Sequence, residues 1–436
     1  TCAQGNVPLY AVNATMVKHI QAGVRFAARY DLRLAVKSSG HDYLGRSTAK
    51  NSLLIWVHYF QNITFTESFN IDGMNLGSAV TLGSGVGLHT IYTAAESVGK
   101  MVVGGSAATV ALGGGYIQGG GHSALSPSFG LASDNALQFE VVLASGELIT
   151  ANRKSYPDLF WALRGGGGGS WGVVTSATIK TYPTFNATYY TVTAALPSVE
   201  SVSSIMTSHA RHIFDWGDIG HYYSISVTPL VLVFETLFPN TSAEDAIALT
   251  APFWGEAISL GAVVLTNSTT TSLVNKLFSR LDDSVGIMQA LGSRLIPAAA
   301  YHDIPDIVGK THVRTGKVAE NANISSAVTP KWRTAKNHFV TSVSWNESTT
   351  PEEVQALREA LTTQLVPLLA NATGETDSGA YFNEADVHEP DSQTTFFGGN
   401  YARLSQIKAN YDPKDLFIVG AGVGSERWDE YGLCTV

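Results

Sequence analysis

The chain has 436 residues, of which 44% are hydrophobic and 14% are charged, and this length suffices for two domains with substantial cores. Its formal net charge is −9 and it has no run of five Lys or Arg residues, which argues against nucleic acid or an anionic membrane surface as a partner. No apolar run reaches the roughly 18 residues of a membrane span.

Other features of the composition favour an extracellular protein. The chain starts at Thr1 without an initiator methionine, so we interpret it as a processed form. Asn-x-Ser/Thr sequons are more frequent than chance predicts and lie at Asn13, Asn62, Asn186, Asn240, Asn267, Asn323, Asn346 and Asn371. We therefore expect secretion and attached N-glycans. Cys2 and Cys434 pair with each other or with cysteines outside this sequence, and their spacing excludes a CxxC site.

The N-terminal region predicts a helix followed by a strand and a polar turn. Residues 13–32 have helical periodicity, with Asn13 or Thr15 expected as the cap. The apolar face of this helix consists of Val17, Ile20, Val24 and Ala27. A strand is expected at 32–37, and the turn after it, VKSSGHDYLGRST (36–48), contains Ser, Gly and one histidine.

Alternation of strands and helices with glycine turns continues to about residue 180. A strand is predicted at 52–57, a helix at 88–100 ending at Gly99, and a hairpin at 139–149 with its turn at Ser145-Gly146. Glycine then becomes rare, and Thr/Val/Tyr-rich strands mix with longer helices.

One of these later helices has a strong start signal. Thr350 is the expected cap, Pro351 occupies the first helical position, and Glu353 completes a capping box.

Three glycine clusters, at 83–87, 102–123 and 164–174, indicate a ligand site. Glycine lets backbone N–H groups approach a ligand closely and form anion-binding concavities. None of the clusters is followed by a good helix and an acidic residue, as a Rossmann site requires, and no Walker GK[ST] motif is present. With the turn at 36–48, the clusters favour a large ligand with a pyrophosphate group. Ordinary tight turns remain the alternative.

Histidines are the next candidates for chemistry. Three of them can each be explained as hydrogen-bonded structural residues: His41, His58 and His122. Because they form no HxH or HxxxH pattern, they do not predict a metal site. The strand pattern of NHFVTSVSW (337–345) places His338 on a face with small polar residues. That face is compatible with a cleft wall or with a hydrogen-bonded core histidine.

The segment YFNEADVHEPD (381–391) concentrates acidic residues. Tyr381 and Glu384 are three residues apart, so a single helical turn would direct both side chains into one pocket. A Ca²⁺ site is the alternative to a solvated loop, and we favour the loop.

In chain order these stretches resemble the flavin-dependent oxidases of the vanillyl-alcohol-oxidase superfamily, specifically the fungal branch of the berberine-bridge-enzyme-like group. The matching blocks are 36–48, 102–123, 130–151, 156–183 and 396–428. The resemblance implies an α+β, two-domain FAD-binding fold of the PCMH type with an inserted antiparallel-sheet substrate domain. We expect an FAD-binding domain at 1–182, the substrate domain at 183–394, and a C-terminal segment at 395–436 that returns to the FAD-binding domain.

The resemblance also assigns cofactor residues. His41 is the expected covalent partner of the 8α-methyl group of FAD, and Ser38, Ser39, Gly40 and Asp42 are expected around the pyrophosphate. The other residues expected to line the cofactor are Gly104, Gly105, Thr109, Val110, Gly113, Gly114, Gly119, Gly120, His122 and Val174. Asn400 and Tyr401 are expected near the isoalloxazine edge.

One block departs from the family pattern. Many relatives attach FAD a second time through a cysteine in a C-P-T-V-G stretch, where this chain reads Ala107-Ala108-Thr109-Val110-Ala111. We therefore expect a single, histidyl bond. Val110 stands where some relatives gate oxygen, and a small residue there is associated with H₂O₂ production.

The resemblance implies hydride transfer from a small-molecule substrate to FAD, helped by a base that removes a proton. The candidate residues are His338, Glu384, Tyr381 and Asn383, with Tyr43 as a pocket wall. We expect a secreted oxidase of an alcohol, a phenolic or a secondary-metabolite compound that uses O₂. The alternatives are a flavin-containing cyclase or dehydrogenase of secondary metabolism, an oligosaccharide oxidase, and a carbohydrate-binding or structural glycoprotein.

Overall fold

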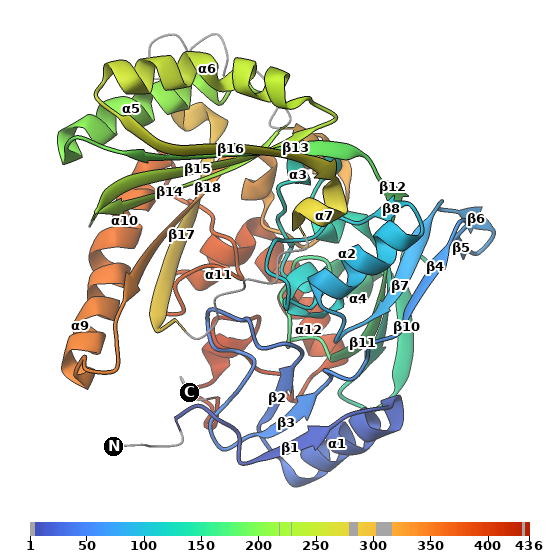
Figure 1. Ribbon diagram of the computed structural model, residues 1–436. Coiled ribbons are helices and arrows are strands. Elements are labelled where there is room, and N and C mark those ends of the chain that lie inside the picture. Colours follow the sequence, from blue (N-terminus) through green and yellow to red (C-terminus); the bar gives the residue numbers. More distant parts are fainter. Residues whose placement is uncertain (1–4, 218, 228, 279–286, 302–315, 430–431) are drawn as a thin grey trace.

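The computed structural model describes residues 5–217, 219–227, 229–278, 287–301, 316–429 and 432–436 (Figure 1). The chain begins with a small parallel sheet in the order β1-β3-β2. Its elements are β1 (Tyr10–Asn13), α1 (Val17–Tyr30), β2 (Leu34–Lys37) and β3 (Leu53–Trp56). Ile20, Val24 and Ala27 of α1 are buried, as the periodicity predicts. The predicted cap is wrong: Met16 holds the cap position, and no side chain caps the helix.

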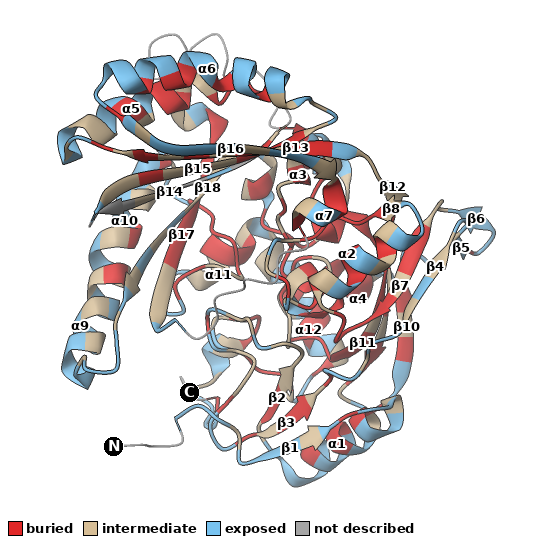
Figure 2. Ribbon diagram, viewed as in Figure 1, coloured by how far each residue is buried: buried red, intermediate tan, exposed pale blue. Residues whose placement is uncertain are grey.

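A second, antiparallel sheet forms the centre of this half of the molecule in the order β10-β9-β11-β7-β4. Its strands are β4 (Ile63–Thr66), β7 (Ala79–Gly83), β9 (Ala136–Val142), β10 (Leu148–Asn152) and β11 (Val173–Lys180). The expected hairpin is present as β9 and β10, with Gly146 at φ +78° in the turn. Buried residues concentrate in β7, β9 and β11, and Figure 2 shows those of β7 and β11 in red.

Short elements connect this sheet to the glycine-rich segments. The helices are α2 (Leu88–Ser97), α3 (Ser126–Phe129) and α4 (Pro157–Ala162). The minor strands are β5 (Asn70–Ile71), β6 (Met74–Asn75), β8 (Lys100–Met101) and β12 (Tyr182–Pro183). Gly87 is the cap residue of α2, so the cluster at 83–87 leads straight into a helix. The expectation that no glycine cluster precedes a good helix is therefore wrong.

Residues after β12 form another sheet, in the order β14-β15-β13-β16. Its strands are β13 (Asn186–Ala195), β14 (Gly220–Val227), β15 (Leu230–Pro239) and β16 (Val263–Leu273). The helices α5 (Val199–His212) and α6 (Ala243–Ser259) cover one face, with their apolar sides buried against it (Figures 1 and 2). The sheet is antiparallel, as the family resemblance implies.

The chain then adds a long two-stranded ribbon, β17 (Gln289–Pro297) with β18 (Ala335–Ser344). Short helices accompany it: α7 (Val274–Phe278), α8 (Gly316–Glu320), α9 (Pro351–Ala360) and α10 (Val366–Ala372). The start of α9 confirms the predicted capping box of Thr350 and Glu353. Whether Cys2 pairs with Cys434 falls outside the described residues, and Cys434 is exposed and forms no disulfide with a described residue.

The last helices, α11 (Ser392–Phe397) and α12 (Tyr401–Tyr411), return to the first half of the molecule (Figure 1). Lys408 of α12 is buried and donates to the carbonyl of Ser170 at 2.8 Å and to Asp412 at 2.6 Å. Among the described helices, none combines the length and hydropathy needed to cross a membrane.

Candidate active site and cofactor cavity

A cleft of about 1360 Å³, including its open mouth, lies where the glycine-rich segments meet. Its wall is built from the turn after β2, the turn before α2, residues 105–122, residues 168–174 and residues 381–384. The last of these comes from the distant part of the chain that follows the inserted sheets. A large cleft with a few converging polar groups is typical of a ligand site.

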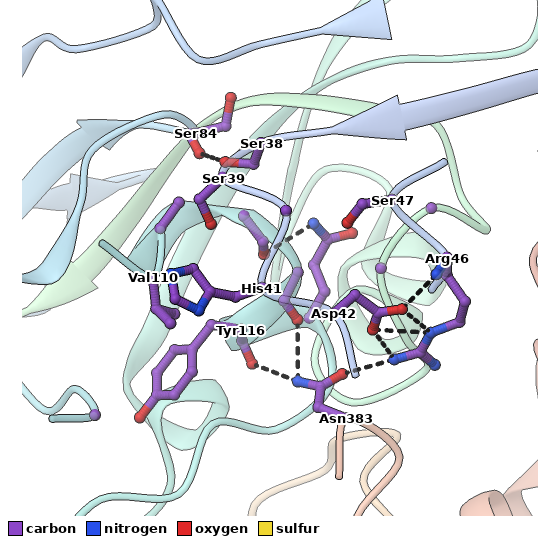
Figure 3. A pocket seen from close by; sticks show the side chains of 18 of the residues that line it. Ser38, Ser39, His41, Asp42, Arg46, Ser47, Ser84, Val110, Tyr116 and Asn383 are labelled. Carbon is purple, nitrogen blue, oxygen red and sulfur yellow. Dashed lines mark hydrogen bonds and ion pairs between the residues drawn. The ribbon is translucent and has the colours of Figure 1, made fainter. Parts of the chain in front are cut away.

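The turn after β2 positions His41 in the cavity wall (Figure 3). The hydroxyl of Ser38 donates to the carbonyl of Ser84 at 2.5 Å, which joins this turn to the turn before α2. Gly40 has φ +100°, a conformation that favours glycine, and it directs the chain back toward the cavity. The Nε2 atom of His41 lies 2.6 Å from the hydroxyl of Thr109, so the ring orientation is fixed from the neighbouring segment.

Arg46 links the same turn to the C-terminal part of the wall (Figure 3). It forms an ion pair with Asp42, and its Nε atom lies 3.0 Å from a carboxylate oxygen. The guanidinium stacks on Phe382 at 3.8 Å and donates to the side chain of Asn383 at 3.4 Å. Sequence analysis did not select Arg46, although it stands inside the quoted turn.

Three residues of the wall have buried polar atoms without a partner among the described residues. They are Nη1 of Arg46, Oγ of Ser84 and Oε1 of Gln118. An unpaired buried polar group costs about 1–3 kcal/mol, and a bound polar molecule would remove that cost. The set offers both donors and acceptors, which fits a cofactor with phosphate, ribose and ring heteroatoms. Sequence analysis missed Ser84 and Gln118; their positions inside the glycine clusters were the available signal.

Most residues selected from the sequence lie in this wall. They are Ser38, Ser39, Gly40, His41, Asp42, Tyr43, Gly105, Val110, Gly114, His122, Val174, Tyr381, Asn383 and Glu384. The structure brings them together from four separate segments, at 38–43, 105–122, 174 and 381–384. Their individual roles stay predictions.

Four predicted cofactor glycines lie behind the wall. A Cβ on Gly119 would come within 2.3 Å of Asn383, and one on Gly104 within 2.5 Å of the Leu88 side chain. A Cβ on Gly113 would lie 3.2 Å from the carbonyl of Gly83. Gly120 faces Val328 and Tyr381 and has φ +126°. These glycines therefore permit close packing of the chain that supports the wall.

Four other selected residues also lie outside the wall. Thr109 contacts His41, as described above. The amide of Asn400 donates to the carbonyl of Val328 at 2.9 Å, and the hydroxyl of Tyr401 donates to Glu426 at 2.6 Å. His338, the fourth, does not line the cavity and lies behind two wall residues that it contacts, His122 and Glu384.

Glu384 stands between two histidines at one end of the cavity. One of its carboxylate oxygens lies 2.9 Å from Nε2 of His122, and the other lies 3.7 Å from Nδ1 of His338. The turn predicted at 381–384 is present: the amide of Glu384 donates to the carbonyl of Tyr381 at 2.9 Å. Both side chains therefore reach the cavity, as their spacing predicts. The aromatic rings of Tyr381 and Trp332 pack around the two imidazoles.

This arrangement shifts the ionisation of all three groups. Burial alone would raise the pKa of Glu384, but the charge of His122 and its hydrogen bond hold that pKa at about 2. Burial lowers the pKa of His122. The charge of the adjacent Glu384 carboxylate and its hydrogen bond together raise that pKa by more, so the net pKa is above its usual value. Burial lowers the pKa of His338 to about 4. At neutral pH the group therefore holds a carboxylate and one neutral imidazole.

Comparisons with known proteins agree with this geometry. Residues 8–152 match the family described as "FAD binding domain", and residues 380–424 match "Berberine and berberine like". An "Uncharacterized FAD-linked oxidoreductase" of Arthroderma benhamiae is 38% identical over 99% of this chain and 80% of its own length.

Solved structures extend the comparison to the fold. The VAO-type flavoprotein MtVAO615 of Myceliophthora thermophila C1 is 32% identical and has a TM-score of 0.87 over 100% of this chain and 83% of its own. A glucooligosaccharide oxidase of Acremonium strictum shares the fold at 20% identity, with a TM-score of 0.75 over 96% of this chain and 92% of its own.

The fold and the cavity define a flavin-dependent oxidoreductase with an inserted antiparallel substrate sheet. The chain belongs to the berberine-bridge-enzyme-like FAD-linked oxidoreductases of the vanillyl-alcohol-oxidase type. FAD is therefore its cofactor, and the cavity described above provides the residues that fit it.

Proposed function

We propose that this protein is an oxidase that holds FAD through a single covalent bond to His41 and transfers electrons from an alcohol, a phenolic or a secondary-metabolite substrate to O₂. The observation that carries the proposal is the position of His41 in the cavity wall, with its ring fixed by Thr109. No cysteine stands in the segment Ala107–Ala111 to form a second bond. When bound, FAD supplies the hydride acceptor.

The protein side chains would prepare the substrate for hydride loss. Glu384 is anionic and lines the cavity, so it can accept a hydrogen bond from a substrate hydroxyl. His122, whose pKa Glu384 raises, can accept the proton when its imidazole is neutral, above that pKa. His338 does not line the cavity, so it is placed to support Glu384. Tyr381 keeps its proton because burial raises its pKa, and its hydroxyl oxygen accepts from Asn383 at 2.9 Å and from the amide of Gly121 at 3.2 Å.

Acid precipitation tests the covalent bond. The yellow flavin of the purified protein should stay in the pellet, whereas His41→Ala should release it into the supernatant. Thr109→Val is the matched control: it removes the contact to His41 but keeps the histidine, so the flavin should remain bound. Flavin released from the unaltered protein would show non-covalent FAD, and colourless protein would contradict an FAD oxidase.

A substrate screen that records both flavin bleaching and H₂O₂ tests the oxidase chemistry. An oxidase should lose its flavin colour with substrate under nitrogen and produce H₂O₂ in air. A dehydrogenase would bleach without producing H₂O₂, and a cyclase with a structural flavin would do neither. The glucooligosaccharide oxidase carries both a 6-S-cysteinyl and an 8α-N1-histidyl bond to FAD. Because this chain lacks the cysteine, we consider oligosaccharides less favoured substrates than smaller molecules.

We propose further that the protein is secreted and N-glycosylated. All eight sequon asparagines have exposed side chains, so folding hides none of them from a glycan. Protein purified from the medium of a eukaryotic host should lose mass in several glycan-sized steps when treated with an N-glycosidase. An unchanged mass would contradict this proposal and leave the FAD chemistry untouched.

A further inference from the structure

Three potential metal ligands meet beside the cofactor cavity: His122, His338 and Glu384. One ring nitrogen of each histidine and one carboxylate oxygen all lie within 4.8 Å of one another. A tetrahedral ion about 2.0–2.2 Å from its ligands separates them by about 3.3 Å. The shortest distances from Glu384 are 2.9 Å from one carboxylate oxygen to Nε2 of His122 and 3.7 Å from the other oxygen to Nδ1 of His338. Rotation of the carboxylate and of the His338 ring would be needed to bring one oxygen and both ring nitrogens to coordination distance.

An independent observation concerns one of these three residues, His338. The Nε2 atom of His338 is buried and has no hydrogen-bond partner among the described residues. Its Nδ1 atom lies 3.7 Å from Glu384, beyond hydrogen-bond distance. Most buried polar atoms are paired, so a histidine with neither nitrogen firmly bonded is unusual. Coordination of Nε2 would account for its missing partner, whereas an ion bound at Nδ1 would leave Nε2 unpaired.

The ligand set selects a class of ion. Two imidazoles and one carboxylate suit Zn²⁺ and neighbouring divalent transition metals, whereas Ca²⁺ and Mg²⁺ prefer oxygen ligands. Three protein ligands leave a coordination position open, as in catalytic zinc sites. His122 and Glu384 line the cavity and His338 lies behind them, so the open position faces the cavity.

We propose that His122, His338 and Glu384 bind one divalent transition-metal ion of the zinc class, whose open position accepts an oxygen donor from a molecule in the cavity. The ion would hold a substrate hydroxyl and increase its acidity, so that its proton passes to water in the cavity and Glu384 acts as a ligand instead of a base. The metal site stands on the geometry alone; only the identity of the oxygen donor as substrate rests on the proposed function.

Calorimetric titration of Zn²⁺ into the FAD-loaded protein, without a histidine tag and after dialysis against EDTA, tests the site. We expect one Zn²⁺ per chain. Glu384→Gln and His338→Gln should each weaken binding at least roughly tenfold. His212→Gln is the matched control, because His212 forms a similar pair with Glu256, at 3.3 Å, in the inserted domain. This variant should bind Zn²⁺ as the unaltered protein does.

Two results would overturn the proposal: absence of a stoichiometric binding event in the unaltered protein, or unchanged affinity in both Glu384→Gln and His338→Gln. Flavin absorbance and the melting temperature, measured on the same samples, show whether a variant has folded. If one of the two is unfolded, the other decides. Failure of metal binding with flavin present would leave the oxidase proposal standing, so the two proposals fail separately.

Discussion

Val110 lines the cavity next to Thr109, the residue that contacts His41 (Figure 3). If O₂ reaches the flavin past this side chain, added bulk will slow reoxidation. We therefore expect Val110→Leu to slow the reaction of photoreduced flavin with O₂ several-fold, measured by stopped-flow absorbance. Val98→Leu, on the exposed surface, is the control and should react at the normal rate. Equal rates for both variants would remove Val110 from the oxygen path.

Arg46 shows how one side chain can serve both the fold and the site. Asp42 neutralises its charge, Phe382 covers one face of its guanidinium, and Nη1 stays without a partner among the described residues. A guanidinium held in this way presents a fixed donor to a ligand. A lysine could not keep both the fork to Asp42 and the stack on Phe382.

At the scale of elements, two kinds of glycine surround the cavity. Some let backbones cross: a Cβ on Gly83 would lie 2.1 Å from the carbonyl of Phe60, and one on Gly85 2.2 Å from that of His58. Others face the cavity itself. Gly115 lines the wall, and a Cβ added to it would meet no described atom within 4 Å.

Substitution by alanine should affect stability at a glycine where backbones cross and flavin binding at a glycine that faces the cavity. Gly83→Ala should lower the free energy of unfolding by about 2–3 kcal/mol, because the carbonyl of Phe60 cannot move away without disturbing the sheet. Gly115→Ala should leave the stability of the flavin-free protein nearly unchanged but reduce its flavin content. Thermal melts and the ratio of flavin to protein absorbance measure both. A large stability loss in Gly115→Ala would show that this glycine is structural.

At the scale of the whole molecule, buried ion pairs join distant segments around the cavity. Arg333, just before β18, contacts both carboxylate oxygens of Asp134 at 2.7 and 2.8 Å. The side chain of Asp134 is 1% exposed and also accepts from Asn321 at 3.2 Å. The pair thus fixes the segment that carries Trp332, one of the rings around His122 and His338.

Breaking this pair should cost much more than breaking a surface pair. Asp134→Asn leaves a buried guanidinium without a counter-charge, and we expect a loss of about 3–5 kcal/mol. Glu320→Gln, which breaks the exposed pair with Lys317, should change stability by no more than about 0.5 kcal/mol. Urea denaturation of both variants measures the difference. Similar losses in the two would show that Asp134 does not hold the segments together.

Much of the fold followed from local patterns in the sequence. The apolar face of α1, the hairpin of β9 and β10 and the capping box of α9 each depend on residues close in sequence, and each is present. The cap of α1 was mispredicted because Asn13 belongs to β1, which ends just before the helix begins. The helix therefore begins at Val17, and Met16 at its cap position has no side-chain oxygen or nitrogen to accept from the first turn.

The sequence by itself, through the resemblance of five ordered blocks to FAD-linked oxidases, predicted a flavin site and His41 in the turn at 36–48, because those blocks and their order are linear features. Only the tertiary structure decided which residues face the cavity. Arg46, which was not predicted, lines the cavity. Four predicted glycines lie behind its wall: Gly104, Gly113, Gly119 and Gly120. The tertiary structure also joined His122 to Glu384 across 262 residues. Contacts of that kind come from the packing of whole segments, and no local spacing encodes them.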